Sequence, residues 1–404
     1  MLKDKKIAVY LCGGIAVYKT ADLVRQLIKK GAQVKVAMTQ SAVQFITPYT
    51  FQILTKQPVY TEIFDKEDKE SVSHIHLADW ADAALVVPAT ANLIAKMANG
   101  MADDFVSTAL LATTAPIFIV PAMNTHMLEN PATVRNMETL KKDGRMLMEP
   151  DTGFLAEGYE GKGRMPEPEK IIEMLQLHLI RLDSSLALTG RKVLISAGGT
   201  KERIDPVRYI TNDSSGKMGY QLAEVARDAG AEVTLVSASG LPNPFGVSVV
   251  AVESAEDMFV EMNKHYQESD IVIMAAAVSD YKPDHQEKQK MKKTSSNQEM
   301  TLKMKQTKDI LAYLGKHKQH QYLAGFAAET HDVARYAESK LQKKKADMII
   351  ANDVSNPQAG FNKDTNEVTI FTTDKDPISV SVRSKKEVAA LILDEIAGKL
   401  RKQR

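Results

Sequence analysis

The chain has 404 residues, of which 44% are hydrophobic and 25% are charged. This length is greater than one ordinary hydrophobic core supports, so it predicts about two domains. Its formal net charge is +1, so no overall field recruits nucleic acid or a membrane surface, and we expect neither as a partner. The single cysteine, Cys12, excludes an internal disulfide and a cysteine-rich metal site. No apolar run is long enough for a membrane span and the first residues show no signal-peptide cleavage pattern, so we expect a cytoplasmic location.

The chain opens with a strand–loop–helix–strand passage. Residues Lys6–Leu11 form a buried-strand pattern that ends in Cys12-Gly13-Gly14. Apolar residues at helical spacing follow over Ala16–Lys30, Gly31 indicates the helix end, and Gln33–Met38 is the next predicted strand. This order is typical of a βαβ unit in a parallel sheet.

A similar passage begins the second half of the chain. It predicts a strand over Lys192–Ser196, a loop with Gly198 and Gly199, a helix from about Tyr220 to Asp228 and a strand over Glu232–Val236. Two such units predict an α/β protein with two doubly wound, mainly parallel-sheet (Rossmann-like) domains.

Two polar stretches interrupt these patterns. The first, residues 183–189, follows a predicted helix from Pro168 to about Leu182, so we expect a linker between domains 1–182 and 190–404. The second, Lys282–Gln306, is rich in Lys, Gln and Ser, which indicates a mobile loop or a hairpin with a disordered tip.

Several other predicted strands share one form, in which apolar residues are followed by small or polar ones. They end at Pro88-Ala89-Thr90, Pro121-Ala122-Met123-Asn124, Ala275-Ala276-Ala277 and Ala351-Asn352-Asp353. In open parallel sheets ligands bind outside the carboxyl ends of the strands, so we expect the functional residues there.

The Gly13–Ala16 loop has backbone N–H groups that could face an anion at a helix N-terminus. It does not match the dinucleotide fingerprint G-x-G-x-x-G, and the second strand ends at Thr39 without an acid to bind a ribose hydroxyl, which disfavours NAD. A tight packing turn with no ligand remains the alternative.

The first half of the chain has three candidates for an active site, namely a histidine, an asparagine amide and a Gly-rich stretch. His74 and His76 lack the companions of a zinc site, but one imidazole suits a general base at neutral pH; a histidine with no chemistry is the alternative. Asn124 could bind a carboxylate, or simply cap its own turn. Residues Gly153–Met165 are too polar for a core and suggest a flap over a site.

Candidate binding residues in the second half include the predicted helix start Asn212–Gly219, which could bind phosphate although no P-loop motif occurs in the chain. Asp280 could bind a metal ion or a ribose, and Lys290, Lys340 and Lys344 offer cations. Lys340 and Lys344 share one helical face, but a solvated charged face would have the same pattern.

These motifs together resemble a known family. Gly13–Lys19, His74-Ile75, Pro121–Asn124 and Gly163–Met165 are similar to flavin-dependent cysteine decarboxylases, whereas Val193–Thr200, Asn212–Gly219, Ala275–Pro283 and Gly325–Thr330 are similar to phosphopantothenate–cysteine ligases. In this order on one chain, they resemble the bifunctional phosphopantothenoylcysteine decarboxylase / phosphopantothenate–cysteine ligase of coenzyme A biosynthesis. The resemblance spans nearly the whole chain.

The resemblance implies two consecutive reactions. The second half would use CTP with Mg²⁺ (or Mn²⁺) to convert 4′-phosphopantothenate into an acyl-cytidylate, from which the amine of L-cysteine displaces CMP. The first half would use FMN to decarboxylate the product to 4′-phosphopantetheine. It also implies a homo-oligomer in which decarboxylase trimers are joined by ligase dimers.

The resemblance also implies residue roles. His74 would be the base and Asn124 would hold the departing carboxylate, while FMN would be surrounded by Gly13, Gly14, Ile15, Ala16, Thr39, Thr90 and Ala91. Arg208 and Asn212 would hold the acyl substrate, and Lys290 matches a catalytic loop lysine. The implied CTP site consists of Ala275, Ala276, Ala277, Asp280, Lys308, Asp309, Ile310, Leu311, Phe326, Lys340 and Lys344, with Asp280 as the candidate magnesium ligand.

One position departs from the family pattern. Well-known members carry a cysteine in the flap where this chain has Glu157. We hypothesise that Glu157 replaces it as proton donor, because a carboxylic acid in a dry pocket can donate at neutral pH. The alternatives are a solvent-facing Glu157 with another donor, or a reaction that stops at the enethiol.

Two alternative interpretations of the sequence, each from another functional class of protein, remain open at this point. A tandem dinucleotide-dependent oxidoreductase would share the fold, although the acids expected at its strand ends are missing. A non-catalytic flavin- or nucleotide-binding regulator would need fewer polar residues at the strand ends than this chain has.

Overall fold

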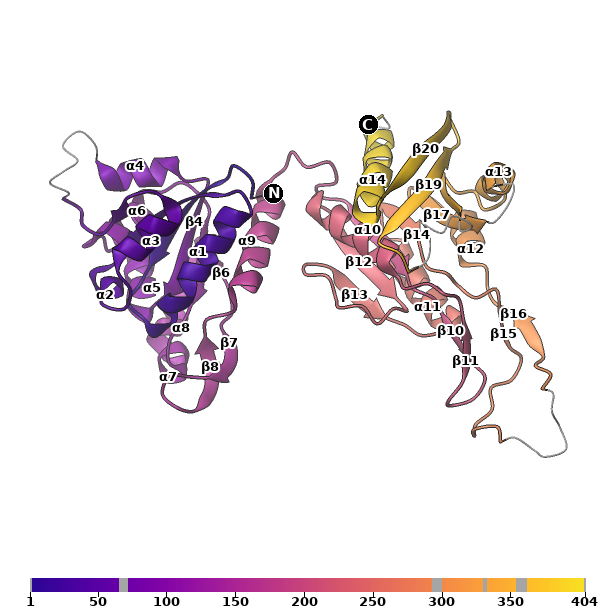
Figure 1. Ribbon diagram of the computed structural model, residues 1–404, viewed down its shortest axis with the longest axis horizontal. Coiled ribbons are helices and arrows are strands. Elements are labelled where there is room, and N and C mark those ends of the chain that lie inside the picture. The colour runs from indigo at the N-terminus through magenta and orange to yellow at the C-terminus, as the bar shows by residue number, and fades with distance from the viewer. Residues whose placement is uncertain (1, 65–71, 293–299, 330–332, 354–361, 403–404) are drawn as a thin grey trace. The chain divides into compact units, whose positions relative to one another are not determined.

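The computed structural model describes residues 2–64, 72–292, 300–329, 333–353 and 362–402 (Figure 1). The chain forms two compact units, Met1–Leu179 (unit 1) and Ile180–Arg404 (unit 2). Each unit has a mainly parallel sheet with helices on both faces, which confirms the predicted fold class. Within the described ranges, we find no helix with the length and apolar character needed to cross a membrane.

The sheet of unit 1 has six parallel strands in the order β3-β2-β1-β4-β5-β6. These are β1 (Lys6–Leu11), β2 (Gln33–Met38), β3 (Val59–Tyr60), β4 (Ala83–Ala89), β5 (Ile117–Pro121) and β6 (Met146–Leu147). The chain runs outward from β1 to β3 and then returns to β4 on the other side of β1. The switch point between β1 and β4 is where doubly wound sheets bind ligands.

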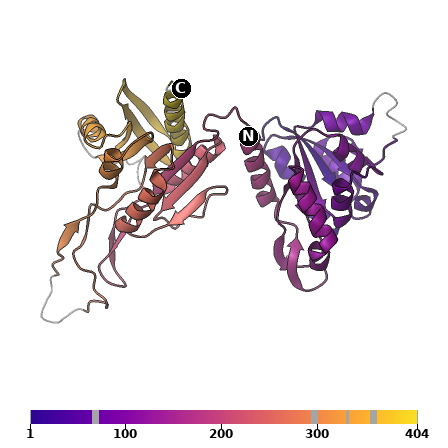
Figure 2. The ribbon, with the colours of Figure 1, turned by 180° about the vertical axis from the view of Figure 1, so that it is seen from behind.

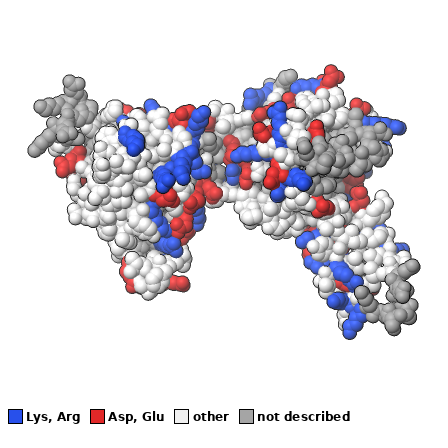
Figure 3. Space-filling model, in the orientation of Figure 1, with Lys and Arg blue, Asp and Glu red and all other residues white. Residues whose placement is uncertain are grey.

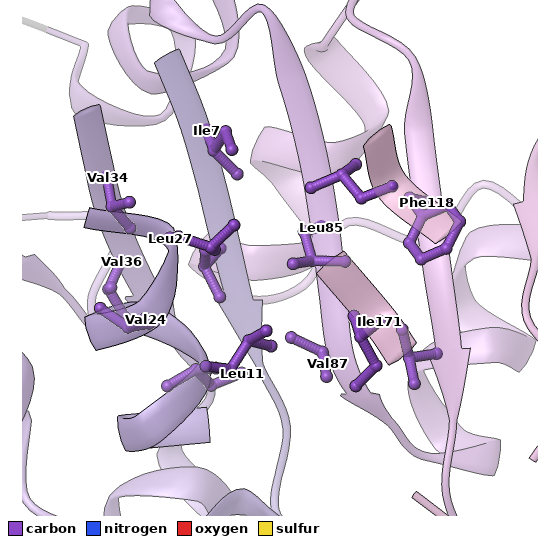
Figure 4. Packing of buried hydrophobic residues seen from close by; sticks show 14 of the residues in the cluster. Ile7, Leu11, Val24, Leu27, Val34, Val36, Leu85, Val87, Phe118 and Ile171 are labelled. Atoms are coloured by element: carbon purple, nitrogen blue, oxygen red, sulfur yellow. The ribbon is translucent and has the colours of Figure 1, made fainter. Parts of the chain in front are cut away.

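Helices cover both faces of this sheet. They are η1 (Ile15–Lys19), α1 (Thr20–Lys29), α2 (Gln40–Val43), α3 (Pro48–Thr55), α4 (Ser73–Trp80), α5 (Ala91–Ala98), α6 (Phe105–Ala112), α7 (Thr125–Glu129), α8 (Pro131–Lys142) and α9 (Pro168–Leu182). On one face, Ile7 and Leu11 of β1 pack with Leu27 of α1 and Ile171 of α9 (Figure 4). The intervening Tyr10 packs on the opposite face, so β1 is buried on both sides.

The first predicted helix differs in detail from the structure. Ala16–Lys30 was expected as one helix, but a 3₁₀ turn, η1, precedes α1. The N–H of Val17 bonds the carbonyl of Gly14 at 3.0 Å, three residues back, and the hydroxyl of Thr20 bonds the carbonyl of Val17. These local bonds keep the first turn tight, so the α-helical pattern begins only at Thr20.

The sheet of unit 2 has eight strands in the order β13-β12-β9-β14-β17-β18-β19-β20. The first six pair in parallel, whereas the β18–β19 and β19–β20 pairings are antiparallel. They are β9 (Lys192–Ala197), β12 (Glu232–Ser237), β13 (Ser248–Ala251), β14 (Ile271–Met274), β17 (Tyr322–Glu329), β18 (Met348–Asp353), β19 (Thr365–Thr372) and β20 (Lys375–Ser384). The antiparallel pair was not predicted.

The helices of unit 2 also lie on two faces. One face packs against α10 (Lys217–Asp228) and α14 (Lys385–Lys402), and the other against α11 (Ala255–Tyr266), α12 (Ile310–Lys316) and α13 (Val333–Lys343). Figure 2 shows the same two layers from behind. Helix α10 starts at the carboxyl edge of the sheet, three residues before the predicted start at Tyr220.

Three hairpins lie outside the main sheets. In unit 1, β7 (Asp151–Phe154) pairs with β8 (Glu160–Arg164), a hairpin that begins two residues before the expected flap and otherwise overlaps it. In unit 2, β10 (Lys201–Arg203) pairs with β11 (Tyr209–Thr211), and β15 (Tyr281–Pro283) pairs with β16 (Met304–Gln306). The last two project from the unit as an arm along which Lys and Arg side chains gather (Figures 1 and 3). The stretch Lys282–Gln306 therefore lies in a hairpin, and the expected disordered tip falls on residues 293–299, outside the described residues.

Candidate active sites

The Gly-Gly loop of unit 1 lies at the switch point of its sheet. A Cβ at Gly13 would lie 2.3 Å from Cβ of Ser41, so only glycine allows this close approach to the start of α2. A Cβ at Gly14 would lie 3.8 Å from Cγ2 of Thr90, which places the loop beside the end of β4. Cys12 is buried and burial raises the pKa of its thiol to about 12, so it is a neutral packing residue at pH 7.

Two threonines follow neighbouring strands at the same edge. Thr39 follows β2 and its Oγ1 accepts the N–H of Ala42 at 3.2 Å; Thr90 follows β4 and its Oγ1 accepts the N–H of Leu93 at 3.4 Å. Each is the N-cap of the helix that begins there, α2 or α5. The residues expected around FMN therefore converge on one edge, on the loops that follow β1, β2 and β4.

His74 is the second residue of α4, a helix that packs against α6. Its ring lies edge-on to Phe105, with ring centroids 6.4 Å apart, and Phe105 stacks on Tyr60 at 5.1 Å. Among the described residues, no group forms a hydrogen bond with the buried Nδ1 of His74. A buried ring nitrogen without a partner costs free energy unless a ligand or water satisfies it.

Asn124 and Glu157 come together at the tip of the β7–β8 hairpin. The amide Nδ2 of Asn124 donates to Oε1 of Glu157 at 3.1 Å and to the hydroxyl of Tyr159 at 2.6 Å. Its Oδ1 accepts the N–H of His126 at 2.9 Å and caps α7. Asn124 is thus both a cap and a donor. The Glu157 side chain is exposed, so this unit by itself does not provide the dry pocket that a raised carboxyl pKa requires.

Close backbone packing holds the hairpin against the end of β5. The N–H of Met123 donates to the carbonyl of Gly163 at 3.0 Å, and the hydroxyl of Thr125 donates to the carbonyl of Lys162 at 2.7 Å. Gly163 has φ +144°, and a Cβ there would lie 2.1 Å from the carbonyl oxygen of Met123. Glycine at this position therefore allows the flap to pack closely against the backbone of Met123 and Asn124.

Two adjoining cavities lie at the carboxyl edge of the unit 2 sheet. Their volumes are about 420 Å³ and about 580 Å³, which is the size range of ligand sites. Five residues line both, so the two form one continuous cleft: Ala276, Val278, Asp280, Phe326 and Lys340. The first cavity extends to the start of α10, and the second extends to the start of α12.

The residues expected to hold CTP line this cleft. Ala275 and Ala277 line the first cavity, Lys308–Leu311 and Lys344 line the second, and the remaining four line both. Asp309 caps α12 by accepting the N–H of Ala312 at 2.9 Å and pairs with Lys344. Lys308 pairs with Glu256 at 2.8 Å, and Lys340 donates to the carbonyl of Phe326 at 3.0 Å. Three lysines therefore surround the second cavity.

Arg208 and Lys290 lie elsewhere, since neither lines these two cavities in the described part of the chain. Arg208 donates to the buried carboxylate of Asp205 at 2.9 Å through Nε and at 2.6 Å through Nη2. Arg208 Nη2 and Asp205 Oδ2 also bond the carbonyl and N–H of Met291, so the pair anchors the backbone next to Lys290. Asn212 does line the first cavity, and its Nδ2 donates to the carbonyl of Ala277 at 3.1 Å.

Both halves of the chain match families of known proteins. Residues 1–179 match the family described as "Flavoprotein", and residues 188–400 match "DNA/pantothenate metabolism flavoprotein C-terminal domain". Over its whole length the chain is 48% identical to the coenzyme A biosynthesis bifunctional protein CoaBC of Bacillus subtilis, with 98% of both chains covered. The chain belongs to the CoaBC family.

Further CoaBC proteins are similar to this chain. The protein from Escherichia coli is 43% identical over 98% of this chain and 97% of its own length. Among solved structures, the C-terminal domain of a CoaBC protein is 45% identical, covers 54% of this chain and all of its own, and has a TM-score of 0.47. Membership of this family excludes the two alternative interpretations of the sequence, a tandem dinucleotide-dependent oxidoreductase and a non-catalytic flavin- or nucleotide-binding regulator.

Several residues that sequence reasoning did not assign also belong to these sites. Tyr159 bonds Asn124 in unit 1, and Asn352, Asn366 and Lys385 line the first cavity of unit 2. Asn352 ends a predicted strand, which was a usable signal. Asn366 and Lys385 belong to β19 and the start of α14, and no sequence motif marked them.

Within the described residues, no group of three or more His, Cys, Asp or Glu side chains could hold a metal ion. Asp280 lines both cavities and is a single carboxylate. Magnesium is commonly bound by one or two carboxylates together with substrate phosphates, so Asp280 fits an ion that arrives with a nucleotide.

Proposed function

We propose that unit 2 joins 4′-phosphopantothenate to L-cysteine at the expense of CTP, and that unit 1 then decarboxylates the product to 4′-phosphopantetheine with FMN. The observation that carries this proposal is the full-length match to CoaBC proteins, with both family domains in the same order. The position of the residues is consistent with it, because the polar groups of each unit gather at the carboxyl edge of its sheet.

In unit 2, the substrate carboxylate attacks the α-phosphorus of CTP and pyrophosphate leaves. The cysteine amine then attacks the acyl carbon and displaces CMP. Both steps change the negative charge on phosphoryl oxygens, and Lys308, Lys340 and Lys344 in the second cavity are placed to stabilise that charge. We assign Asp280 to a magnesium ion bound with the nucleotide, and Lys290 to a loop that closes on the reacting groups.

In unit 1, His74 is the proposed base for the substrate thiol. A thiol with a pKa of about 8.5 is mostly protonated at pH 7 and needs a base to react. We assign this role to the imidazole of His74, which is only half-buried at the start of α4.

Asn124 is the proposed holder of the departing carboxylate. Oε1 of Glu157 already accepts a hydrogen bond from Asn124 Nδ2, so this amide binds a carboxylate in the present geometry. The substrate carboxylate would take the place of Glu157 on Asn124. We also propose Glu157 as the proton donor that follows loss of carbon dioxide, because its carboxyl group lies on the flap beside Asn124.

The loops after β1, β2 and β4 fit FMN. The proposed set of Gly13, Gly14, Ile15, Ala16, Thr39, Thr90 and Ala91 contains no carboxylate, and both threonines offer hydroxyl donors. FMN, when bound, would accept a hydride from the thiol side of the substrate and return it after carbon dioxide has left.

We also propose that the chain assembles as a homo-oligomer. Unit 1 exposes the large apolar side chains of Ile15, Tyr18, Phe45 and Tyr49. Because contiguous apolar surface marks protein interfaces, we propose that another copy of the chain covers these side chains. Native mass spectrometry checks the state, with multiples of three expected for the isolated unit 1; a monomer would contradict the proposal.

One incubation tests the proposed function. The chain is mixed with 4′-phosphopantothenate, cysteine, CTP and MgCl₂, and products are followed by mass, with an absorption spectrum for bound flavin. We expect pyrophosphate, CMP, carbon dioxide and 4′-phosphopantetheine. Absence of 4′-phosphopantothenoylcysteine would contradict the ligase assignment, and its accumulation in a flavin-loaded protein would contradict the decarboxylase assignment.

A further inference from the structure

The carboxylate of Glu167 joins two segments of unit 1 that are remote in sequence. Its Oε1 accepts a hydrogen bond from the ammonium of Lys19 at 2.8 Å and another from Nη2 of Arg164 at 2.8 Å. Lys19 ends η1, the 3₁₀ turn that follows the Gly-Gly loop, and Arg164 ends β8, the second strand of the flap. One carboxylate oxygen therefore connects the loop proposed for FMN with the β7–β8 hairpin.

The backbone of Glu167 has little freedom to move. Glu167 lies between Pro166 and Pro168, and the residue before a proline is restricted to a narrow range of extended conformations. Its carbonyl accepts the N–H of Ile171 at 3.2 Å in the first turn of α9, and Ile171 belongs to the core of unit 1. A fixed backbone therefore holds the carboxylate, and the carboxylate can position the groups that bond to it.

Lys19 depends on this contact more than Arg164 does. The side chain of Lys19 is 11% exposed, whereas that of Arg164 is 44% exposed. Ion pairs between exposed side chains contribute little to stability, but a buried ammonium requires a compensating charge. Its other hydrogen bond goes to the carbonyl of Met165 at 3.4 Å. Loss of the Glu167 charge would leave the ammonium with this long neutral contact among the described residues, so the position of η1 depends on Glu167.

Arg164 extends the connection across the hairpin. A Cβ at Gly153, in β7, would lie 3.3 Å from Nη1 of Arg164, so the guanidinium packs across the partner strand. The preceding residue, Gly163, accepts a hydrogen bond from the N–H of Met123 at 3.0 Å through its carbonyl. The contacts therefore continue from the Gly-Gly loop to the backbone beside Asn124.

We propose that Glu167 is a positioning residue of unit 1, which fixes the β7–β8 hairpin relative to the Gly-Gly loop through Arg164 and Lys19. This rests on the proposed function for the identity of FMN as the group at the loop. The loop and Lys19 belong to one tight turn, so FMN at the loop restrains the hairpin through Glu167. The coupling is reciprocal, so a hairpin held by Glu167 also strengthens FMN binding.

Glu167→Gln in the full chain is the main test, because it removes the charge and keeps the shape of the side chain. Glu169→Gln, two residues further on, is the matched control, since Glu169 bonds the neutral amide of Gln26. Fluorescence titration of the flavin-free protein measures FMN binding, and hydrogen exchange of residues 151–164 measures opening of the hairpin with and without FMN.

In wild type, FMN should slow hydrogen exchange in the hairpin. We expect Glu167→Gln to weaken FMN binding about fivefold or more, the scale of one hydrogen bond between charged groups that is partly open to solvent. It should also speed exchange in the hairpin several-fold in the flavin-free protein. Glu169→Gln should match wild type in both measurements.

Two further variants separate the two contacts of Glu167. Arg164→Gln should speed exchange in the hairpin but leave FMN binding within about twofold, because Lys19 keeps its carboxylate partner. In a Lys19→Met background, Glu167→Gln should change FMN binding by less than about twofold, because the ammonium it bonds is already absent. A role of Glu167 only in starting α9 would give the same loss in both backgrounds.

Thermal melting of each variant shows that unit 1 is folded. Equal effects of Glu167→Gln and Glu169→Gln, or an undiminished effect of Glu167→Gln in the Lys19→Met background, would overturn the proposal. If Glu167→Gln does not fold, Lys19→Met decides: FMN should then no longer slow exchange in the hairpin, and a slowing equal to that in wild type would overturn the proposal.

The flavin-free measurements keep this test separate from the proposed function. If wild type binds no FMN, the proposed decarboxylase function fails, whereas faster hairpin exchange in flavin-free Glu167→Gln still supports the positioning role. If wild type binds FMN and Glu167→Gln matches it in both measurements, only the role of Glu167 fails.

Discussion

Units 1 and 2 share one sheet order and differ in what is added to it. The order β3-β2-β1-β4-β5-β6 in unit 1 corresponds to β13-β12-β9-β14-β17-β18 in unit 2, and both place a Gly-Gly loop after the first strand. Unit 2 then continues with the antiparallel β19 and β20, and its arm is inserted after β9 and β14. Unit 1 instead adds the β7–β8 hairpin after β6.

The groups at the edges of the two sheets also differ in their chemistry. The groups proposed for catalysis at the edge of unit 1 are an imidazole, an amide and a flap carboxyl, which suits proton transfer and carboxylate binding. The cleft of unit 2 contains Lys308, Lys340, Lys344 and Lys385, which suits phosphate groups. The shared sheet fixes where a ligand lies, whereas the side chains at its edge decide which ligand it is.

The largest expected effect is at His74. His74→Asn should reduce decarboxylation roughly 10²–10⁴-fold, the usual contribution of one general base, while FMN binding persists. Carbon dioxide release and the flavin spectrum measure the two effects, and the exposed His76→Asn is the control. A His74 variant within about twofold of wild type would leave the histidine with a packing role only.

Lys290 should have the largest effect in unit 2. Lys290→Gln should slow pyrophosphate release about 10²-fold, the scale of one lost charge-stabilising contact, without preventing CTP binding. Lys288→Gln, in the same basic segment, should have little effect. Equal effects of the two substitutions would indicate that the segment contributes only general positive charge.

Glu157 should affect only the second half of the decarboxylase reaction. Glu157→Gln should release carbon dioxide normally but accumulate the enethiol, because proton return slows by at least about tenfold. Mass spectrometry distinguishes the enethiol from 4′-phosphopantetheine, and Glu160→Gln is the control. Complete reduction by Glu157→Gln would assign the proton to another donor, and an enethiol product from wild type would mean that unit 1 stops there.

Asp205 should make unit 2 sensitive to acid. Hydrogen bonds from Arg208 hold the pKa of Asp205 well below its usual range. Its stabilisation is therefore present above the unfolded pKa of about 3.9 and is lost as pH falls through the lower folded value. We expect Asp205→Asn to lower the Tm of unit 2 at pH 7 and to reduce the loss of Tm between pH 5 and 3.

The exposed Asp376→Asn should change neither quantity. If the Tm of Asp205→Asn falls with acid as steeply as that of wild type, the acid sensitivity comes from other carboxylates. Ligase turnover should also fall in Asp205→Asn, because the bonds to Met291 that anchor the Lys290 segment are weakened.

Separating the units should have the smallest effect. Residues 1–182 and 190–404 each contain a buried core, so we predict that each folds alone and keeps its activity within about twofold. The first fragment should carry flavin, and the second should release pyrophosphate. Failure of both to fold would contradict the proposed boundary, which falls close to the end of α9.

Local sequence patterns determined much of the fold and the position of the sites. The apolar runs predicted β1 and β2 to the residue, and small or polar residues at strand ends marked Thr90, Asn124 and the alanines 275–277. This is possible because strand burial and helix periodicity repeat over a few residues and are visible within one segment. The order of parallel strands then places their carboxyl ends along one edge.

Tertiary structure alone decided which distant side chains join these edges. Asn366 and Lys385 reach the first cavity because β19 pairs antiparallel with β18, in a register that sets Asn352 opposite Val368. Tyr159 reaches Asn124 through the hairpin, and Arg208 bonds Asp205 rather than lining the cleft. Strand pairing, register and the choice among competing partners depend on contacts between remote segments, so no local pattern in the sequence specifies them.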